Sequence, residues 1–128
     1  MDPASLAITV AILIGKAAAE AMAGEAGKAV WASISKLRDT LRAKFRGDSD
    51  VEKTMNQLEA TPTDARAQEL ADVLKDRIAA DPAFAAELSR RLDELQANPG
   101  SASFVTEVRD NAQVSKIVNV QSARDLHL

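Results

Sequence analysis

At 128 residues, the chain is long enough for one domain with its own hydrophobic core and too short for two domains of ordinary size. It contains no cysteine, which excludes a disulfide framework, a thiolate metal site and a cysteine nucleophile. Aromatic residues make up 3% and hydrophobic residues 46%, with abundant alanine and few Gly and Pro. This composition favours packed helices over sheets, and it leaves the redox compartment undecided.

The first predicted helix runs from Pro3 to Ala23 and is almost entirely apolar. Asp2 and Pro3 have the chemistry of an N-cap and a first helical residue, and Lys16 and Glu20 are the only charged residues that follow within it. A helix of about 20 residues spans about 30 Å, the thickness of a hydrocarbon core. Apolar side chains lie on all sides of its first half, so the helix is either fully buried or able to enter a membrane. The side chains of this candidate membrane-active helix are Leu6, Ile8, Val10, Ile12, Leu13 and Ile14.

A secretory signal peptide is one alternative for this segment, because its alanines offer small-residue cleavage sites. Such signals carry positive charge before the apolar region, whereas Asp2 is the only charged side chain there. A permanent single-span anchor is also disfavoured, because the dense apolar part over residues 6–14 is short and the alanines that follow add little transfer energy. Insertion under particular conditions stays open.

Gly24 and Gly27 predict a break before a second, amphipathic helix that carries most of the positive charge. Residues 28–47 hold six basic side chains and one acidic one, whereas residues 48–97 hold six basic and twelve acidic ones. One interpretation is complementary charge between packed helices, or simply solvated faces. The other is a cationic surface for anionic lipid headgroups. The candidate headgroup ligands are Lys28, Lys36, Arg38, Arg42, Lys44 and Arg46.

Glycine, proline and capping residues predict three shorter helices after the basic one. Gly47 supplies a helix stop and Asp48 the next N-cap, so a third helix is expected over about 49–59. Thr61 is predicted to cap a fourth helix, with Pro62 in its first turn.

Asp81 repeats the cap-and-proline signal for a fifth helix, which ends at residues 98–100 with Asn-Pro-Gly. Short connections imply antiparallel neighbours. The predicted fold is therefore an all-α, antiparallel bundle of four to five helices over residues 1–97, followed by a linker over residues 98–110.

The last segment, residues 111–128, is β-prone and rich in amide side chains, unlike the helices before it. As an extended strand it would place Val118 and Val120 on one face and Asn119 and Gln121 on the other. In-register copies from many chains could then stack into a cross-β arrangement, although a disordered terminus or an edge strand is the alternative. The candidate residues of this motif are Val114, Ile117, Val118, Asn119, Val120 and Gln121.

The run from Asn111 to His127 resembles the bacterial amyloid signalling motifs, some of them related to the RHIM of animal necroptosis proteins. Those motifs have a hydrophobic-Gln core followed by a small residue. Here Ser122 and Ala123 follow Gln121, where a RHIM-type core would have an aliphatic residue and Gly. We therefore expect the local turn geometry to differ from that of a RHIM.

The whole layout is similar to that of the bacterial Bell domains, counterparts of the fungal HeLo-like and HELL cell-death effectors. In both, an apolar first helix and a helical bundle are joined to a C-terminal amyloid motif. The resemblance implies an immune-type effector in the cytoplasm whose tail is templated by an NLR-type receptor bearing a similar motif. The chains would then oligomerise, and the first helix would act on the inner face of the plasma membrane.

Motifs for catalysis or nucleotide binding are weak. The stretch from Gly24 to Lys28 is similar to the end of a phosphate-binding loop, but Met22 stands where the first Gly should be and no strand precedes it. His127 is the only histidine, which disfavours a metal site or a His-based triad. We expect no enzyme activity, no cofactor, no small-molecule substrate and no nucleic-acid partner.

A calcium loop is also disfavoured. Asp48, Asp50, Glu52 and Glu59 match four positions of the calcium-loop template, but Lys53 occupies the position where the sharp turn requires Gly. Capping and first-turn acids explain this cluster better. Two non-membrane functions stay open beside the effector: an adaptor that recruits partners through its helical faces and its tail, and a soluble homo-oligomer with an idle tail.

Overall fold

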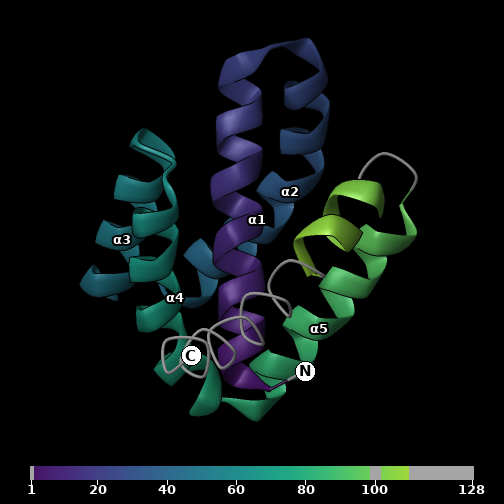
Figure 1. Cartoon of the computed structure of the whole chain (residues 1–128). Coiled ribbons are helices and arrows are strands. Elements are labelled where there is room, and N and C mark those ends of the chain that lie inside the picture. Colours follow the sequence, from purple (N-terminus) through teal and green to yellow (C-terminus); the bar gives the residue numbers. More distant parts are fainter. Residues whose placement is uncertain (1, 99–101, 110–128) are drawn as a thin grey trace, which may run out of the picture.

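The computed structural model describes residues 2–98 and 102–109, and every element in that part of the chain is helical (Figure 1). The helices are α1 (Pro3–Ala23), α2 (Glu25–Lys44), α3 (Ser49–Ala60), α4 (Asp64–Ala79) and α5 (Pro82–Ala97). Residues 102–109 form a further helical segment. The prediction of an all-α fold is confirmed. The predicted motif over residues 111–128 lies outside the described residues.

Three helices begin where the capping chemistry of the sequence predicts. Asp2, Asp48 and Asp81 are the N-caps of α1, α3 and α5, and each side chain accepts a hydrogen bond from the backbone N–H three residues further on. Gly47 has a φ of 89°, a left-handed conformation that glycine adopts without steric cost, and it ends the turn after α2.

The start of α4 differs from the prediction. Thr61 was expected to be its N-cap, but its backbone N–H bonds to the carbonyl of Gln57, so Thr61 caps the C-terminus of α3 instead. Thr63 takes the N-cap position, where its hydroxyl oxygen accepts a hydrogen bond from the backbone N–H of Arg66 at 3.2 Å. Pro62 therefore lies in the connection, before the first turn of α4.

Helix α1 lies at the centre of the bundle and contacts each of α2, α3, α4 and α5 (Figure 1). Every residue from 3 to 15 in this helix is buried or partly buried. Thr9, the one buried polar side chain among the described residues, donates its hydroxyl hydrogen to the carbonyl of Ser5 at 2.8 Å. A helix with apolar side chains on all sides is either buried inside a protein or inserted in a membrane. In this structure, α1 is buried inside the bundle.

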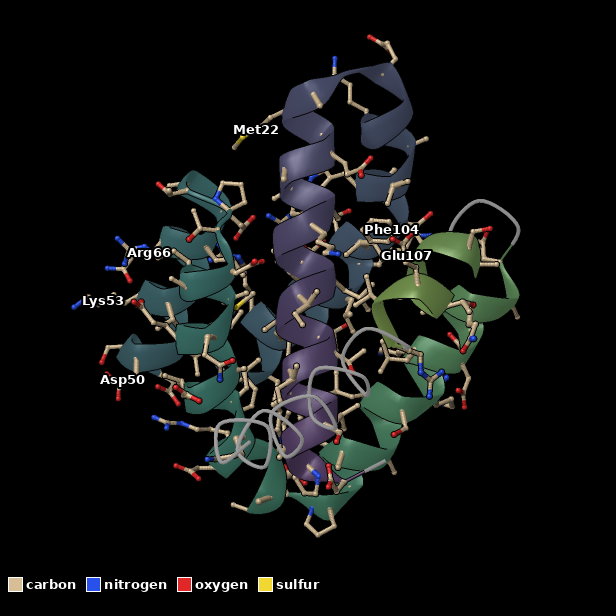
Figure 2. The ribbon with its side chains drawn as sticks, viewed as in Figure 1. Met22, Asp50, Lys53, Arg66, Phe104 and Glu107 are labelled. Carbon is tan, nitrogen blue, oxygen red and sulfur yellow. The ribbon has the colours of Figure 1, made fainter. Side chains whose placement is uncertain are left out.

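The far end of α1 is exposed and forms a hairpin with α2, which projects at the top of Figure 1. Met22, at 65% exposure, is the only exposed large hydrophobic side chain among the described residues (Figure 2). Gly27 was expected to lie in a break, but it lies inside α2 and faces the backbone of α1. A Cβ atom at Gly27 would be only 1.8 Å from the carbonyl oxygen of Glu20, so the two backbones touch there.

Residues 102–109 differ from the linker that the sequence predicted, because they are helical and packed. Val105 is fully buried, Val108 is 1% exposed, and both belong to the core cluster of the bundle. Phe104 packs against the same cluster (Figure 2). These side chains lie on one helical face, which gives a short segment enough apolar area to dock.

Polar contacts to α5 hold the same segment in place. The Arg109 guanidinium donates from Nη1 to the amide oxygen of Gln96 at 2.6 Å, and it forms an ion pair with Asp93 at 3.1 Å. The amide nitrogen of Gln96 also donates to the hydroxyl of Thr106 at 2.9 Å. The bundle thus extends to residue 109 within the described part of the chain.

The close approach at Gly27 predicts an asymmetric response to two glycine substitutions. Gly27→Ala should destabilise the protein by about 1–3 kcal/mol, because the new Cβ meets backbone atoms of α1 that cannot move independently of the helix. Gly24→Ala is the control, since no atom lies within 4 Å of a Cβ at that position. Chemical denaturation of both variants checks this, and equal midpoints would contradict the packing described for the hairpin.

Candidate functional site

The candidate membrane-active side chains of α1 lie inside the bundle. Leu6, Val10, Leu13 and Ile14 have no exposed surface, and the partly buried Ile8 and Ile12 pack against the core. Pro3–Ala23 is the one helix in the described part of the chain that is long and apolar enough to cross a membrane, with a mean hydropathy of 1.7 over an 18-residue stretch within it. Core helices of soluble proteins share that property. Contact of these side chains with lipid would therefore require α1 to leave its position.

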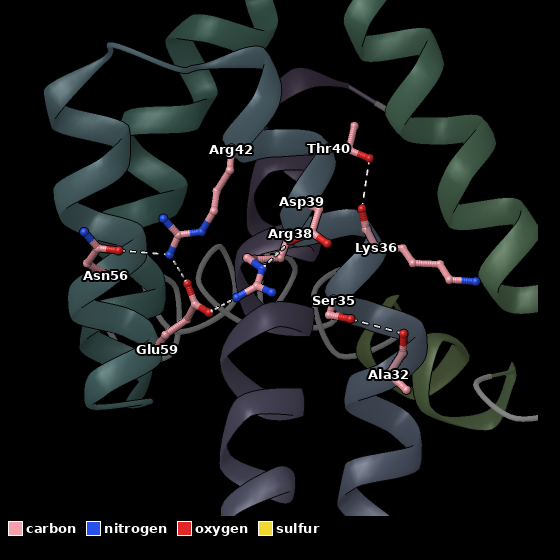
Figure 3. Close-up of polar contacts among 9 residues, drawn as sticks. All are labelled: Ala32, Ser35, Lys36, Arg38, Asp39, Thr40, Arg42, Asn56 and Glu59. Carbon is pink, nitrogen blue, oxygen red and sulfur yellow. Dashed lines mark hydrogen bonds and ion pairs between the residues drawn. The ribbon is translucent and has the colours of Figure 1, made fainter.

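Two of the six candidate headgroup ligands are tied to α3 by a shared carboxylate (Figure 3). Arg38 donates from Nη1 to Oε1 of Glu59 at 2.6 Å, and Arg42 donates to the other oxygen of the same carboxylate. Arg42 also donates to the amide oxygen of Asn56 at 2.9 Å. The Glu59 side chain is only 18% exposed, so the two guanidinium groups neutralise a carboxylate that is shielded from water.

A third candidate, Lys44, pairs with the turn between α4 and α5. Its ammonium lies 2.7 Å from Oδ2 of Asp81 and 5.3 Å from the ring centroid of Phe84. The hydrogen bond from Lys44 holds the pKa of Asp81 below its ordinary value, and the backbone N–H of Phe84 adds to this effect. Asp81 thus serves both as a helix cap and as the partner of Lys44.

The acids that match part of a calcium-loop template have other partners. Asp48 accepts hydrogen bonds from the Arg77 guanidinium, with Nε at 3.1 Å from Oδ2. This contact lowers the pKa of Asp48 and raises the pKa of Arg77. Asp50 lies 3.4 Å from the same guanidinium. Within residues 2–98 and 102–109, no group of three or more metal-binding side chains could hold a metal ion.

The remaining candidate ligands are accessible. Lys28 is exposed and forms only a long contact of 3.5 Å with the exposed Glu25. Lys36 and Arg46 are exposed and form no ion pair with the described residues. The six predicted ligands therefore do not form one uniform cationic surface: three belong to ion pairs that join α2 to the rest of the bundle, and three face solvent.

Comparison with known protein families supplies the identification. A family model for the Het-E N-terminal domain matches residues 1–126. The chain belongs to this family. The Het-E N-terminal domain family is associated with HeLo-type cell-death effectors, which supports an effector role for this member. The match continues past residue 109 into the segment for which an amyloid motif is predicted. No curated protein and no solved structure matches the chain.

The sequence of this member of the Het-E N-terminal domain family did not predict that Arg38 and Arg42 share one partner, Glu59. Glu59 stood out only as one of four acids that match an otherwise unsuitable calcium-loop template, whereas in the structure its carboxylate accepts hydrogen bonds from both Arg38 and Arg42. The segregation of basic and acidic charge between consecutive helices was the available signal. It indicates complementary pairing in general but does not identify which acid meets which base.

Removal of the Glu59 charge should unmask Arg38 and Arg42 for anionic lipid. Glu59→Gln should strengthen binding to anionic vesicles by about 1 kcal/mol for each arginine that becomes available. Glu107→Gln is the matched control, because it removes the same charge from an exposed acid that forms no ion pair with the described residues. Vesicle co-sedimentation, with circular dichroism to verify folding, measures the difference. Equal binding of the two variants would mean that only net charge matters.

Proposed function

We propose that the chain is a membrane-directed cell-death effector that is held inactive by the burial of α1. One observation carries this proposal: the longest and most apolar helix among the described residues is also the one that the other helices enclose. Burial inside the bundle and insertion into a bilayer are alternative ways to remove the same apolar surface from water. A switch between them needs only a trigger that weakens the enclosure.

The proposed trigger is assembly of the tail over residues 111–128. The resemblance to bacterial amyloid signalling motifs supports templating by an NLR-type receptor with a similar motif, as in Bell-type innate immunity. Assembly would gather many copies of α1 at one place, and avidity could then sustain insertion that one alanine-rich helix cannot sustain alone. In this proposal the chain starts in the cytoplasm and moves to the inner face of the plasma membrane.

The proposal requires α1 to separate from α4, and an engineered disulfide can test that step. A Cβ atom at Gly15 of α1 would lie 3.8 Å from the Cβ of Ala67 in α4, which is the usual separation in a disulfide. The natural chain has no cysteine, so Gly15→Cys with Ala67→Cys creates a single possible bridge. We expect liposome leakage, triggered by tail fibrils, to fall to background in the oxidised variant and to return on reduction.

The control for this experiment is Gly15→Cys alone, which should be insensitive to oxidant. The same Cβ lies 3.1 Å from a terminal methyl group of Leu58, so thermal unfolding must show that the reduced variants fold. Leakage by the locked form equal to that of the reduced form would contradict release of α1. Fibril formation without leakage in any form, including the natural chain, would favour the adaptor function.

The tail is tested separately from the bundle. A peptide covering residues 110–128 should form fibrils with a cross-β reflection at about 4.7 Å. Val118→Pro or Gln121→Pro should prevent this by removing a backbone donor, and Val120→Asp should do so by stacking like charges. Fibre diffraction and dye binding measure the outcome. A peptide that stays monomeric even when seeded by a related motif would refute amyloid signalling.

A further inference from the structure

Helices α2 and α5 leave a cavity between them that is lined mainly by hydrogen-bond donors and cations. Its volume is about 150 Å³, smaller than the roughly 300–1,000 Å³ of pockets for drug-sized ligands. It therefore suits a small ion or one group of a larger molecule. The lining residues are Ser33, Lys36 and Leu37 on α2 and Arg91, Glu94, Leu95 and Asn98 on α5 and its C-cap.

Arg91 lines this cavity, and the Nε of its guanidinium lies in the buried part of the side chain. This atom is shielded from solvent and has no hydrogen-bond partner among the described residues. The other end of the guanidinium lies 3.7 Å from Oε1 of Glu87, which is an ion pair but longer than a hydrogen bond. A buried cationic N–H without an acceptor is unfavourable, so a small movement of the guanidinium that brings this N–H to an acceptor on a ligand in the cavity would be favourable.

Lys36 supplies a second cation at the same cavity. Figure 3 shows its side chain extending away from the Arg38 and Glu59 contacts toward α5. Unlike Arg38, it forms no ion pair within the described residues. The acid in the lining, Glu94, accepts a hydrogen bond from Arg90 at 2.6 Å, which offsets its charge. The hydroxyl of Ser33 adds a neutral donor to the lining.

We propose that this cavity binds a phosphate-type oxyanion, with Arg91 and Lys36 as its principal ligands. A guanidinium N–H, an ammonium and a hydroxyl present donors of different geometry, which matches a tetrahedral anion with several acceptor oxygens better than a planar carboxylate. The ligand is either a soluble phosphate ester or the phosphomonoester headgroup of a lipid. This inference does not depend on release of α1, because the cavity exists in the closed bundle.

Calorimetric titration of the full chain with inorganic phosphate, at constant ionic strength, tests the proposal. We expect saturable binding that weakens by at least about tenfold in Arg91→Met and in Lys36→Met. Lys75→Met is the control, because it removes an exposed cation of α4 that neither lines the cavity nor pairs with a residue that does. Lys36 is exposed, so its substitution tests the site without risk to folding, and Arg91→Lys keeps the charge but lacks the Nε hydrogen.

A second arm distinguishes the two sources of the ligand. Vesicles of phosphatidylcholine with phosphatidic acid are compared with vesicles of equal surface charge that contain phosphatidylserine. A preference for phosphatidic acid that disappears in Lys36→Met assigns the site to a lipid headgroup, whereas binding of inorganic phosphate without that preference assigns it to a soluble ester. Absence of both, or binding equal in the Arg91, Lys36 and Lys75 variants, would overturn the proposal.

Discussion

Enclosure of α1 is the constraint on which the rest of this structure depends. A helix with apolar side chains all round cannot rest on one neighbour, because one side would stay in water. Helices α2, α3, α4 and α5 accordingly each direct an apolar stripe at α1 or at its neighbours, and Val105 and Val108 add a further contribution to the same core. Gly15 helps by allowing Leu58 of α3 and Ala67 of α4 to approach closely.

The features of the fold that could be predicted from the sequence are those set by interactions between residues close together in the chain. The bounds of α1 and the caps at Asp48 and Asp81 depend on a few neighbouring residues, so the sequence pattern was sufficient. The features that could not be predicted depend on contacts between distant segments. Gly27 appears as a helix breaker until the backbone of α1 lies against it, and residues 102–109 have a linker composition at their start but an apolar face that only the assembled core can bury.

For the candidate functional residues too, some features could be predicted from the sequence and others depend on contacts between distant segments. The apolar stretch of α1 is visible in the sequence, whereas its burial follows from packing. The basic residues of α2 are equally visible, but their partners are not: Glu59 and Asp81 neutralise three of them, while Lys36 is left beside Arg91. Charge patterns therefore located the cationic helix correctly and could not divide its residues between structural and accessible roles.

The docking of residues 102–109 has a geometric consequence for the proposed assembly. Strands in a cross-β stack repeat every 4.7–4.8 Å, but a single helix with its side chains is about 10–12 Å across, so neighbouring bundles cannot sit side by side at that repeat. While Arg109 is held by Asp93, only residue 110 separates the bundle from the predicted motif. Steric crowding along the stack would therefore pull directly on this segment. If the eight residues 102–109 undocked and became extended, they would add about 26 Å to the connection between each bundle and the stack. Val105 and Val108 would then lose their buried positions in the core.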